Sequence, residues 1–100
     1  EIGRGGVSYR QVGRDLYGKA LQLIHERYEA GAQSGRIRLR HEGEEVGLVL
    51  SGQLEVTVGD RRSVLGPGEA YYLTSSIPHR FRNTGTEPCE IISASTPPTF

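Results

Sequence analysis

The fold is decided by residues 41–83, where His41-Glu42-Gly43-Glu44-Glu45 is followed by Gly52, by Gly66-Pro67-Gly68 and by Pro78-His79-Arg80-Phe81-Arg82-Asn83. Glycines and prolines at these places predict tight turns between short strands. Two imidazoles and one carboxylate, from His41, Glu45 and His79, form a ligand set that open-sided sites use for divalent transition metals. Because alternate residues of a strand share a face, neighbouring strands would bring these three side chains to one point.

Short strands at fairly even spacing flank this stretch, and they predict an all-β sandwich or barrel. The segment from Leu16 to Glu29 also suits a helical face, and we interpret it as a strand because Leu21, Leu23 and His25 alternate with Gln22, Ile24 and Glu26. Residues 46–50 and 54–58 are expected to form a hairpin across Ser51-Gly52. The predicted strands are 7–12, 16–29, 36–41, 46–50, 54–58, 62–65, 70–73, 79–82 and 90–95, with turns at 13–15, 31–35, 51–52, 59–60 and 66–68.

The composition favours a single strand-and-turn domain, since the chain has 100 residues with 14 glycines and 5 prolines. Its 12 basic and 12 acidic side chains cancel, so it lacks the basic face that nucleic-acid binding generally needs. The only cysteine, Cys89, cannot form an internal disulfide, and we interpret it as a small core residue. One thiol and no signal-like apolar stretch predict a cytoplasmic protein without a membrane span.

The chain has no methionine and begins with Glu1. A natural chain begins with methionine, and removal of that methionine usually needs a small following residue, so we expect this chain to be part of a longer protein. Residues 1–35 would then form a lead-in and N-terminal strands. Residues 36–100 would form the core of the domain, with both halves of the ligand set.

The run from His41 to Gly52 resembles the first motif of the cupin superfamily, in which two histidines separated by one residue precede a glutamate and a glycine. The segment from Gly66 to Asn83 resembles the second cupin motif and supplies His79. The resemblance implies a cupin fold, which is a double-stranded β-helix or jelly-roll barrel. It also implies a divalent transition metal, such as Zn, Fe, Mn or Ni, held by His41, Glu45 and His79.

Leu39 departs from the cupin pattern, because it stands where the family has its first histidine. An apolar side chain in place of an imidazole removes one metal bond and should lower the metal affinity. The same region then predicts an effector pocket, in which polar side chains bind an organic ligand between apolar walls. Its predicted lining is Leu39, His41, Glu45, Val49, Tyr72, His79 and Phe81.

Residues 41–47 and the tail 91–100 resemble the sensor half of bacterial regulators of the XRE type, which join an N-terminal helix-turn-helix of the Cro/CI type to a C-terminal cupin. This resemblance implies a homodimer that binds a small-molecule effector, such as an amine or amino-acid derivative that suits Glu44 and Glu45. DNA would be bound only through a helix-turn-helix domain upstream of Glu1.

Two other functions stay open at this point. Many cupins are metal-dependent enzymes, so a dioxygenase or isomerase with a two-histidine, one-carboxylate site is the alternative to the sensor. We assign no catalytic residue, because Tyr71, Tyr72 and His25 are interpreted as packing residues. The remaining hypothesis is a barrel that serves only dimerisation, through strand edges at 7–12 or 21–24.

Overall fold

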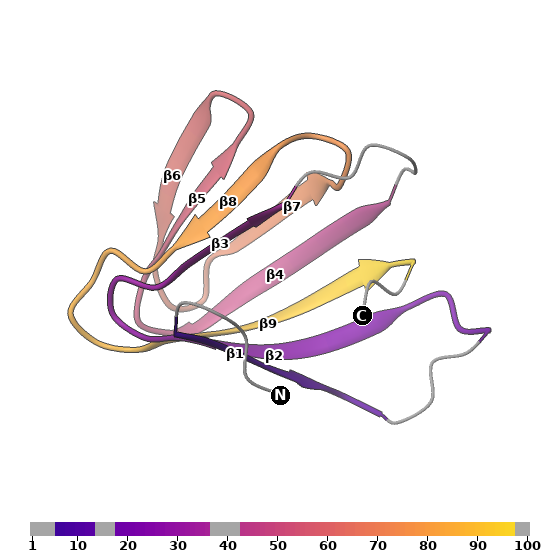
Figure 1. Cartoon of the computed structure of the whole chain (residues 1–100), viewed down its shortest axis with the longest axis horizontal. Helices are drawn as coiled ribbons and strands as arrows, with labels where there is room; N and C mark the ends of the chain where they lie inside the picture. Colours follow the sequence, from indigo (N-terminus) through magenta and orange to yellow (C-terminus); the bar gives the residue numbers. More distant parts are fainter. Residues whose placement is uncertain (1–5, 14–17, 37–42, 98–100) are drawn as a thin grey trace.

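The chain folds as two antiparallel sheets packed against each other, and Figure 1 shows them meeting at one end and diverging toward the other. This computed structural model describes residues 6–13, 18–36 and 43–97. Their strands are β1 (Val7–Gln11), β2 (Gln22–Tyr28), β3 (Gln33–Arg36), β4 (Glu44–Ser51), β5 (Leu54–Val58), β6 (Arg61–Leu65), β7 (Ala70–Thr74), β8 (His79–Arg82) and β9 (Cys89–Thr96). The predicted all-β fold is confirmed. Within these ranges no helix is long and apolar enough to cross a membrane.

The two sheets have five and four strands, in the orders β1-β2-β9-β4-β7 and β3-β8-β5-β6. Strands far apart in sequence are neighbours, since the last strand, β9, lies between β2 and β4. Backbone pairing of residue 22 with residue 95 therefore holds the two ends of the domain together. With this strand order, the segments 41–52 and 66–83, which carry the two predicted motifs, contribute strands to both packed sheets.

Period-two alternation decides which face of each strand is buried. In β2 the side chains of Gln22, Ile24, Glu26 and Tyr28 are buried, and the residues between them are exposed or half-buried. The alternation predicted for this segment is confirmed, and the buried face is the more polar one. Residues 18–21 are not in a strand, so β2 begins later than predicted, and residues 14–17 lie outside the described part.

The core lies between the sheets and draws side chains from both. Tyr28, Val49 and Ile91 come from the five-stranded sheet, and Leu54 and Phe81 from the four-stranded one. Cys89 is fully buried among them, which confirms its role as a small core residue. Burial also raises the pKa of its thiol to about 11.

The predicted hairpin between residues 46–50 and 54–58 is wrong, because β4 and β5 belong to different sheets. Both edges of β4 are taken, by β7 and β9, while β5 pairs with β6 and β8. The chain crosses between the sheets at Gly52, whose φ is +77°. A Cβ there would lie 2.5 Å from the Pro88 carbonyl oxygen, so only glycine fits this crossing. The hairpin of this region is instead β5–β6, across the predicted turn at Gly59-Asp60.

The predicted turn at residues 31–35 is wrong from residue 33 onward. Gln33 to Arg36 form β3 and pair with β8, from Gln33 opposite Arg82 to Arg36 opposite His79. Pairing with a neighbouring strand outweighs the turn propensity of Ser34 and Gly35, which is a local preference only. The predicted strand 36–41 is thus observed only at Arg36, and residues 37–41 lie outside the described part.

Candidate functional site

The inner face of the five-stranded sheet becomes more polar from one end to the other. Residues directly opposite each other on adjacent strands share a face. One such row, near the crossing at Gly52, contains Glu26, Ile91 and Val49. Another row contains Gln22, Ser95 and Glu45, and it lies at the end where Gly43 leads into β4. All three residues of the second row are polar, whereas Glu26 is the one polar residue of the first row.

Glu45 is held at this polar end by Tyr71, whose hydroxyl donates a hydrogen bond of 2.5 Å to Glu45 Oε2. The Tyr71 ring reaches Glu45 by crossing over Gly47, the residue opposite it on β4. A Cβ on Gly47 would lie 2.2 Å from the ring, so the missing side chain makes room for it. Burial, and then the negative charge of Glu45, raise the pKa of Tyr71 well above its ordinary value. Tyr71 is therefore a neutral donor that fixes the orientation of the Glu45 carboxylate.

His79 lies on the opposite sheet and is linked to this pair through aromatic rings in tilted contact. The Tyr71 and Phe81 ring centroids are 5.0 Å apart, and those of Phe81 and His79 are 5.6 Å apart. His79 Nδ1 lies 2.8 Å from the Ile77 carbonyl oxygen. Because a carbonyl only accepts, Nδ1 carries a proton, and in the neutral ring Nε2 is then an acceptor. This is the second-sphere contact by which proteins orient a metal-binding or ligand-binding imidazole.

Glu26 is a second inner carboxylate, which the sequence analysis did not select. Ser93 Oγ donates to Glu26 Oε2 at 2.6 Å, and the Tyr28 hydroxyl donates to Oε1 at 3.2 Å. Tyr28 OH also lies 2.7 Å from Ser34 Oγ. Burial, and then the charge of Glu26, raise the pKa of Tyr28 well above its ordinary value, and Glu26 also contributes to the raised pKa of Tyr71. The signal was present in the sequence, because Glu26 is in phase with Ile24 and Tyr28 on the buried face.

These five residues form what we call the inner polar cluster: Glu26, Tyr28, Glu45, Tyr71 and Ser93. It combines two carboxylates with three hydroxyl groups between two sheets. Each carboxylate has about four lone-pair sites and accepts hydrogen bonds only. The cluster is therefore suited chemically to a ligand that donates hydrogen bonds and carries positive charge.

The structure separates the predicted pocket residues into two groups. Val49 and Phe81 are buried in the core, and His79 is buried beside Phe81. Tyr72 is 66% exposed on the outer face of the five-stranded sheet, because it precedes a buried residue and follows another on β7. Glu45 contacts Tyr71 on the inner side. Leu39 and His41 lie outside the described part of the chain, so their place in the pocket stays a prediction.

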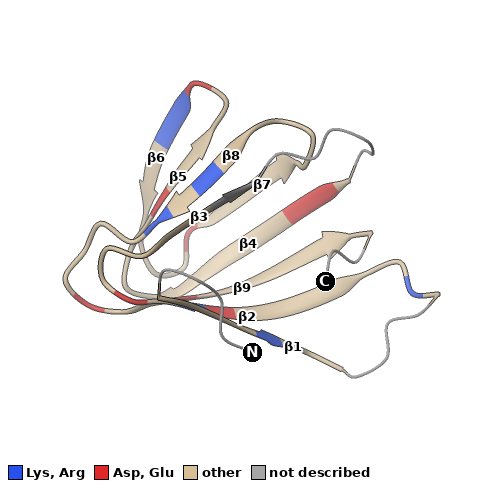
Figure 2. Ribbon diagram, viewed as in Figure 1, with Lys and Arg blue, Asp and Glu red and all other residues tan. Residues whose placement is uncertain are grey.

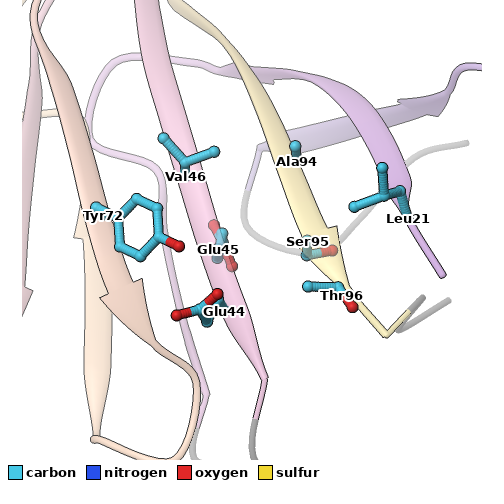
Figure 3. Close-up of a pocket in the computed structure, with 8 residues that line it drawn as sticks. All are labelled: Leu21, Glu44, Glu45, Val46, Tyr72, Ala94, Ser95 and Thr96. Atoms are coloured by element: carbon cyan, nitrogen blue, oxygen red, sulfur yellow. The ribbon is translucent and has the colours of Figure 1, made fainter.

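A shallow groove of about 180 Å³ lies at the ends of β4 and β9, where residues of both faces of the sheet line it (Figure 3). The groove is bounded by Tyr72 on one side and Leu21 on the other. A hydrogen bond to Glu44 is the main reason why the pKa of Tyr72 is raised. Glu44 and Glu45 thus lie on opposite faces of β4, although they are adjacent in sequence. The groove is lined by Leu21, Glu44, Glu45, Val46, Tyr72, Ala94, Ser95 and Thr96.

Asn83 and Glu44, which belong to the two motif segments, make contacts outside the predicted metal ligand set. Asn83 is fully buried, and its Nδ2 donates to the carbonyl oxygens of Tyr28 and Glu87 at 3.0 Å and 2.8 Å. Its Oδ1 accepts from the Gly85 amide at 2.9 Å. Asn83 therefore fastens the connection between β8 and β9. Glu44 contacts Tyr72 on the outer face.

The predicted metal ligands Glu45 and His79 lie on opposite sheets, on β4 and β8. Among the residues that the structure describes, no group of three His, Cys, Asp or Glu side chains is arranged to hold a metal ion. Glu45 and His79 are two of the three predicted ligands, and the third, His41, is not described. His79 has the fixed orientation that suits a ligand, whereas Glu45 is engaged with Tyr71.

Residues 24–95 match the cupin domain family, Cupin_2. The whole chain is 40% identical to the HTH-type transcriptional regulator PuuR of Escherichia coli (strain K12), and the protein of that name from Shigella flexneri matches equally well. The aligned 100 residues are 54% of those relatives, so the chain spans about half their length.

Solved structures share this fold at low sequence identity. The Cupin_2 domain of an XRE family transcriptional regulator from Enterobacter cloacae superposes with a TM-score of 0.84 and 19% identity, covering 94% of this chain and 99% of that one. KdgF from Halomonas sp. gives a TM-score of 0.82 at 18% identity, covering 99% of this chain and 86% of that one. An oxalate oxidase in complex with glycolate gives 0.78 at 16%, covering 93% and 52%. These likenesses confirm the cupin fold.

Proposed function

This chain belongs to the cupin family, and from that premise we propose that it is the effector-sensing and dimerisation domain of a bacterial transcriptional regulator. The identity of 40% along all 100 residues to a helix-turn-helix regulator is the observation that carries this proposal. In the proposed protein a helix-turn-helix domain precedes the cupin and makes the contacts with DNA in the cytoplasm. The neutral net charge of the chain supports the assignment of DNA binding to the other domain, because DNA binding relies on basic side chains.

The effector in this proposal is a small amine or amino-acid derivative that binds between the two sheets, at the inner polar cluster. The inner polar cluster offers two carboxylates of fixed orientation, and charge-assisted hydrogen bonds to such groups are the strong ones. The rings of Tyr71 and Phe81 would supply an apolar wall beside the ammonium group. An effector with higher affinity for one arrangement of the paired domains would then shift the population of that arrangement.

The binding experiment compares two adjacent glutamates that face opposite ways. Isothermal titration of the purified chain with linear amines, diamines and amino acids should give binding that Glu45→Gln weakens by about tenfold or more, the effect of losing a charged hydrogen bond. Glu44→Gln is the matched control and should bind as the wild type does. Equal losses in the two variants, or binding of carboxylic acids in preference to amines, would reject the amine as the effector class.

The regulatory part needs the longer protein that carries the DNA-binding domain. Its affinity for operator DNA, selected from genomic fragments, should change on addition of any amine that the cupin binds. The Glu45→Gln variant should bind the operator but respond only at higher amine concentration. An operator affinity that stays constant while the cupin is saturated would refute the sensor.

A metal-dependent enzyme is a second candidate, favoured by one observation. The Nδ1 contact of His79 with Ile77 leaves Nε2 in the orientation that a metal ligand needs. A divalent transition metal on His41, Glu45 and His79 would supply Lewis acidity, and Leu39 would lower its affinity. Elemental analysis decides whether this site works: about one equivalent of Zn, Fe, Mn or Ni that is lost in His79→Ala supports it. A metal-free chain that resists reloading counts against it.

A further inference from the structure

The outer face of the five-stranded sheet carries most of the exposed apolar surface of the described residues. Among the described residues, nine large apolar side chains are exposed, and seven of the nine lie on the outer face of the five-stranded sheet. The other two, Val64 and Ile77, lie on β6 and before β8, away from it. The seven are Val12, Leu21, Leu23, Val46, Leu48, Leu50 and Tyr72.

The strand register makes these side chains contiguous. Val12 donates a backbone hydrogen bond to Leu23, which pairs with Ala94, and Ala94 pairs with Val46, which pairs with Tyr72. One unbroken apolar row therefore crosses the whole sheet. The next row is apolar at Ile92, Leu48 and Ala70 and continues into His25 on β2. Contiguous apolar rows of this kind on a water-facing sheet mark an interaction surface.

Charged groups on this face lie around the apolar rows, and several of them contact one another. Arg10 lies opposite His25, and Glu44 lies at the start of β4. Glu90 Oε1 lies 2.9 Å from His25 Nε2, and Glu90 Oε2 lies 3.5 Å from Arg27. Arg27 also contacts Glu29 at 2.8 Å. These groups lie at the edge of the apolar rows, which gives the face an apolar centre and a polar rim. Figure 2 shows basic residues on β6 and β8 of the other sheet, whereas the centre of the five-stranded sheet has none.

We propose that this outer face is the interface between two copies of this chain. The proposal rests on the proposed function, because a helix-turn-helix protein reads two half-sites as a dimer. A dimer of this kind is isologous, so each copy presents the same patch, and apolar rows flanked by paired charges are self-complementary. The interface differs from pairing through the strand edges at 7–12 or 21–24, which leaves this face in water.

The size of the face suits a stable dimer. Five strands about 4.8 Å apart and up to eight residues long, at about 3.4 Å a residue, make a face on the order of 500 Å² in projection. The accessible area of such a corrugated face is larger and approaches the roughly 800 Å² per partner of standard interfaces. The groove between Leu21 and Tyr72, at about 180 Å³, is a receptor for one side chain of the partner copy.

The test is the oligomeric state of the chain and of surface variants, measured by sedimentation velocity over about two decades of concentration. The wild type should be a dimer. Val46→Glu, Leu48→Glu and Tyr72→Glu, from two strands of the face, should each weaken the dimer by about 100-fold or more, since a charge is then buried without a partner. Val64→Glu is the matched control, because it is equally exposed on the other sheet, and it should leave the dimer intact.

Three results would overturn the proposal. They are a wild type that is monomeric throughout, a dimer that survives all three substitutions on this face, and an equal effect of Val64→Glu. A dimer that only Gln11→Pro disrupts would indicate edge pairing instead, because the backbone N–H of Gln11 points to the open edge of β1. Far-UV circular dichroism must show that monomeric variants are folded. If the chain forms this dimer but binds no amine, the sensor is rejected and the interface is supported. If the chain binds an amine but is a monomer, the sensor is supported and the interface is rejected.

Discussion

At the scale of single residues, Gly47 is what allows Tyr71 to reach Glu45. The ring crosses β4 at the one position without a side chain, and the clash on adding a Cβ involves a rigid ring. The donor, the carboxylate and the glycine therefore act as one unit. The glycine belongs to this unit through the space that it leaves open, and a pattern of polar and apolar residues does not reveal such a role.

We expect Gly47→Ala to lower the free energy of unfolding by about 1–3 kcal/mol, which is typical of overpacking in a core. The ring must move away from β4, so the hydrogen bond to Glu45 should weaken as well. Urea unfolding followed by circular dichroism measures the change. Gly66→Ala is the control, because its Cβ would meet only Glu69 at an ordinary 3.7 Å, and it should cost less than about 0.5 kcal/mol. Similar losses in both variants would show that the ring does not depend on Gly47.

Tyr28 and Tyr71 should make the protein less stable in alkali. Burial, followed by the nearby glutamates, raises the pKa of both phenols above the unfolded value of about 10. Below that value both states are protonated and the stabilisation is complete. As pH rises above it, the unfolded state loses protons first, so the free energy of unfolding falls.

Urea midpoints measured from neutral pH into the alkaline range should therefore decline above about pH 10. Tyr71→Phe should reduce that slope, and Tyr72→Phe should change it less because Tyr72 is exposed to solvent. An ultraviolet titration of the native protein should show two tyrosines that do not ionise before unfolding. A slope that Tyr71→Phe leaves unchanged would contradict this assignment.

At the scale of elements, the connections that cross between the two sheets are fixed by particular contacts. Gly52 passes within reach of Pro88, and Asn83 fastens the segment between β8 and β9 through three hydrogen bonds. Both crossings lie at the apolar end of the sandwich, beside Cys89. These contacts fix the connections at this end of the sandwich.

Asn83→Ala should lower the free energy of unfolding by about 2–4 kcal/mol, because two buried carbonyl groups and one amide lose their partner. Thermal and urea unfolding measure the loss. Thr84→Ala removes a single exposed hydrogen bond with Gln53 and should cost less than about 0.5 kcal/mol. If metal or effector binding falls in Asn83→Ala while stability is unchanged, Asn83 belongs to the site and not to the scaffold.

At the scale of the whole molecule, the two sheets differ on their outer faces as well as in strand number. The five-stranded sheet turns apolar rows outward, whereas the outward residues of β8 are Arg80 and Arg82. The proposed effector lies between the sheets and the proposed partner lies on one of them. β4 connects the two, because Glu45 faces inward and Val46 and Leu48 face outward.

This arrangement predicts a stability that depends on protein concentration. Unfolding of a dimer is coupled to its dissociation, so the thermal midpoint should rise as the concentration of the wild type increases. Leu48→Glu should abolish that dependence and match the wild type at the lowest concentration. A midpoint of the wild type that is constant over about two decades of concentration would contradict the dimer.

Much of the fold could be predicted from local pattern. Period-two alternation located most of the strands, and the glycines at 59–60 and 66–68 located turns that the structure contains. The cupin resemblance of the two motifs is confirmed by the family match. The buried state of Cys89 also followed from its chemistry. These features depend on interactions between residues close in sequence or on a residue's own hydrophobicity.

The candidate site depended on information that is not local. Glu26 joins the inner polar cluster because β9 carries Ser93 beside β2, and Tyr72 leaves the predicted pocket because β7 turns it outward. The hairpin of β4 with β5 failed for the same reason, since alternation shows that a strand is half-buried but not which strand pairs with it. The sequence by itself thus determined most of the strands and turns and the family. Only the tertiary structure decided the partners of each strand and the face of each side chain, because pairing over long sequence distance depends on the packing of the whole sandwich.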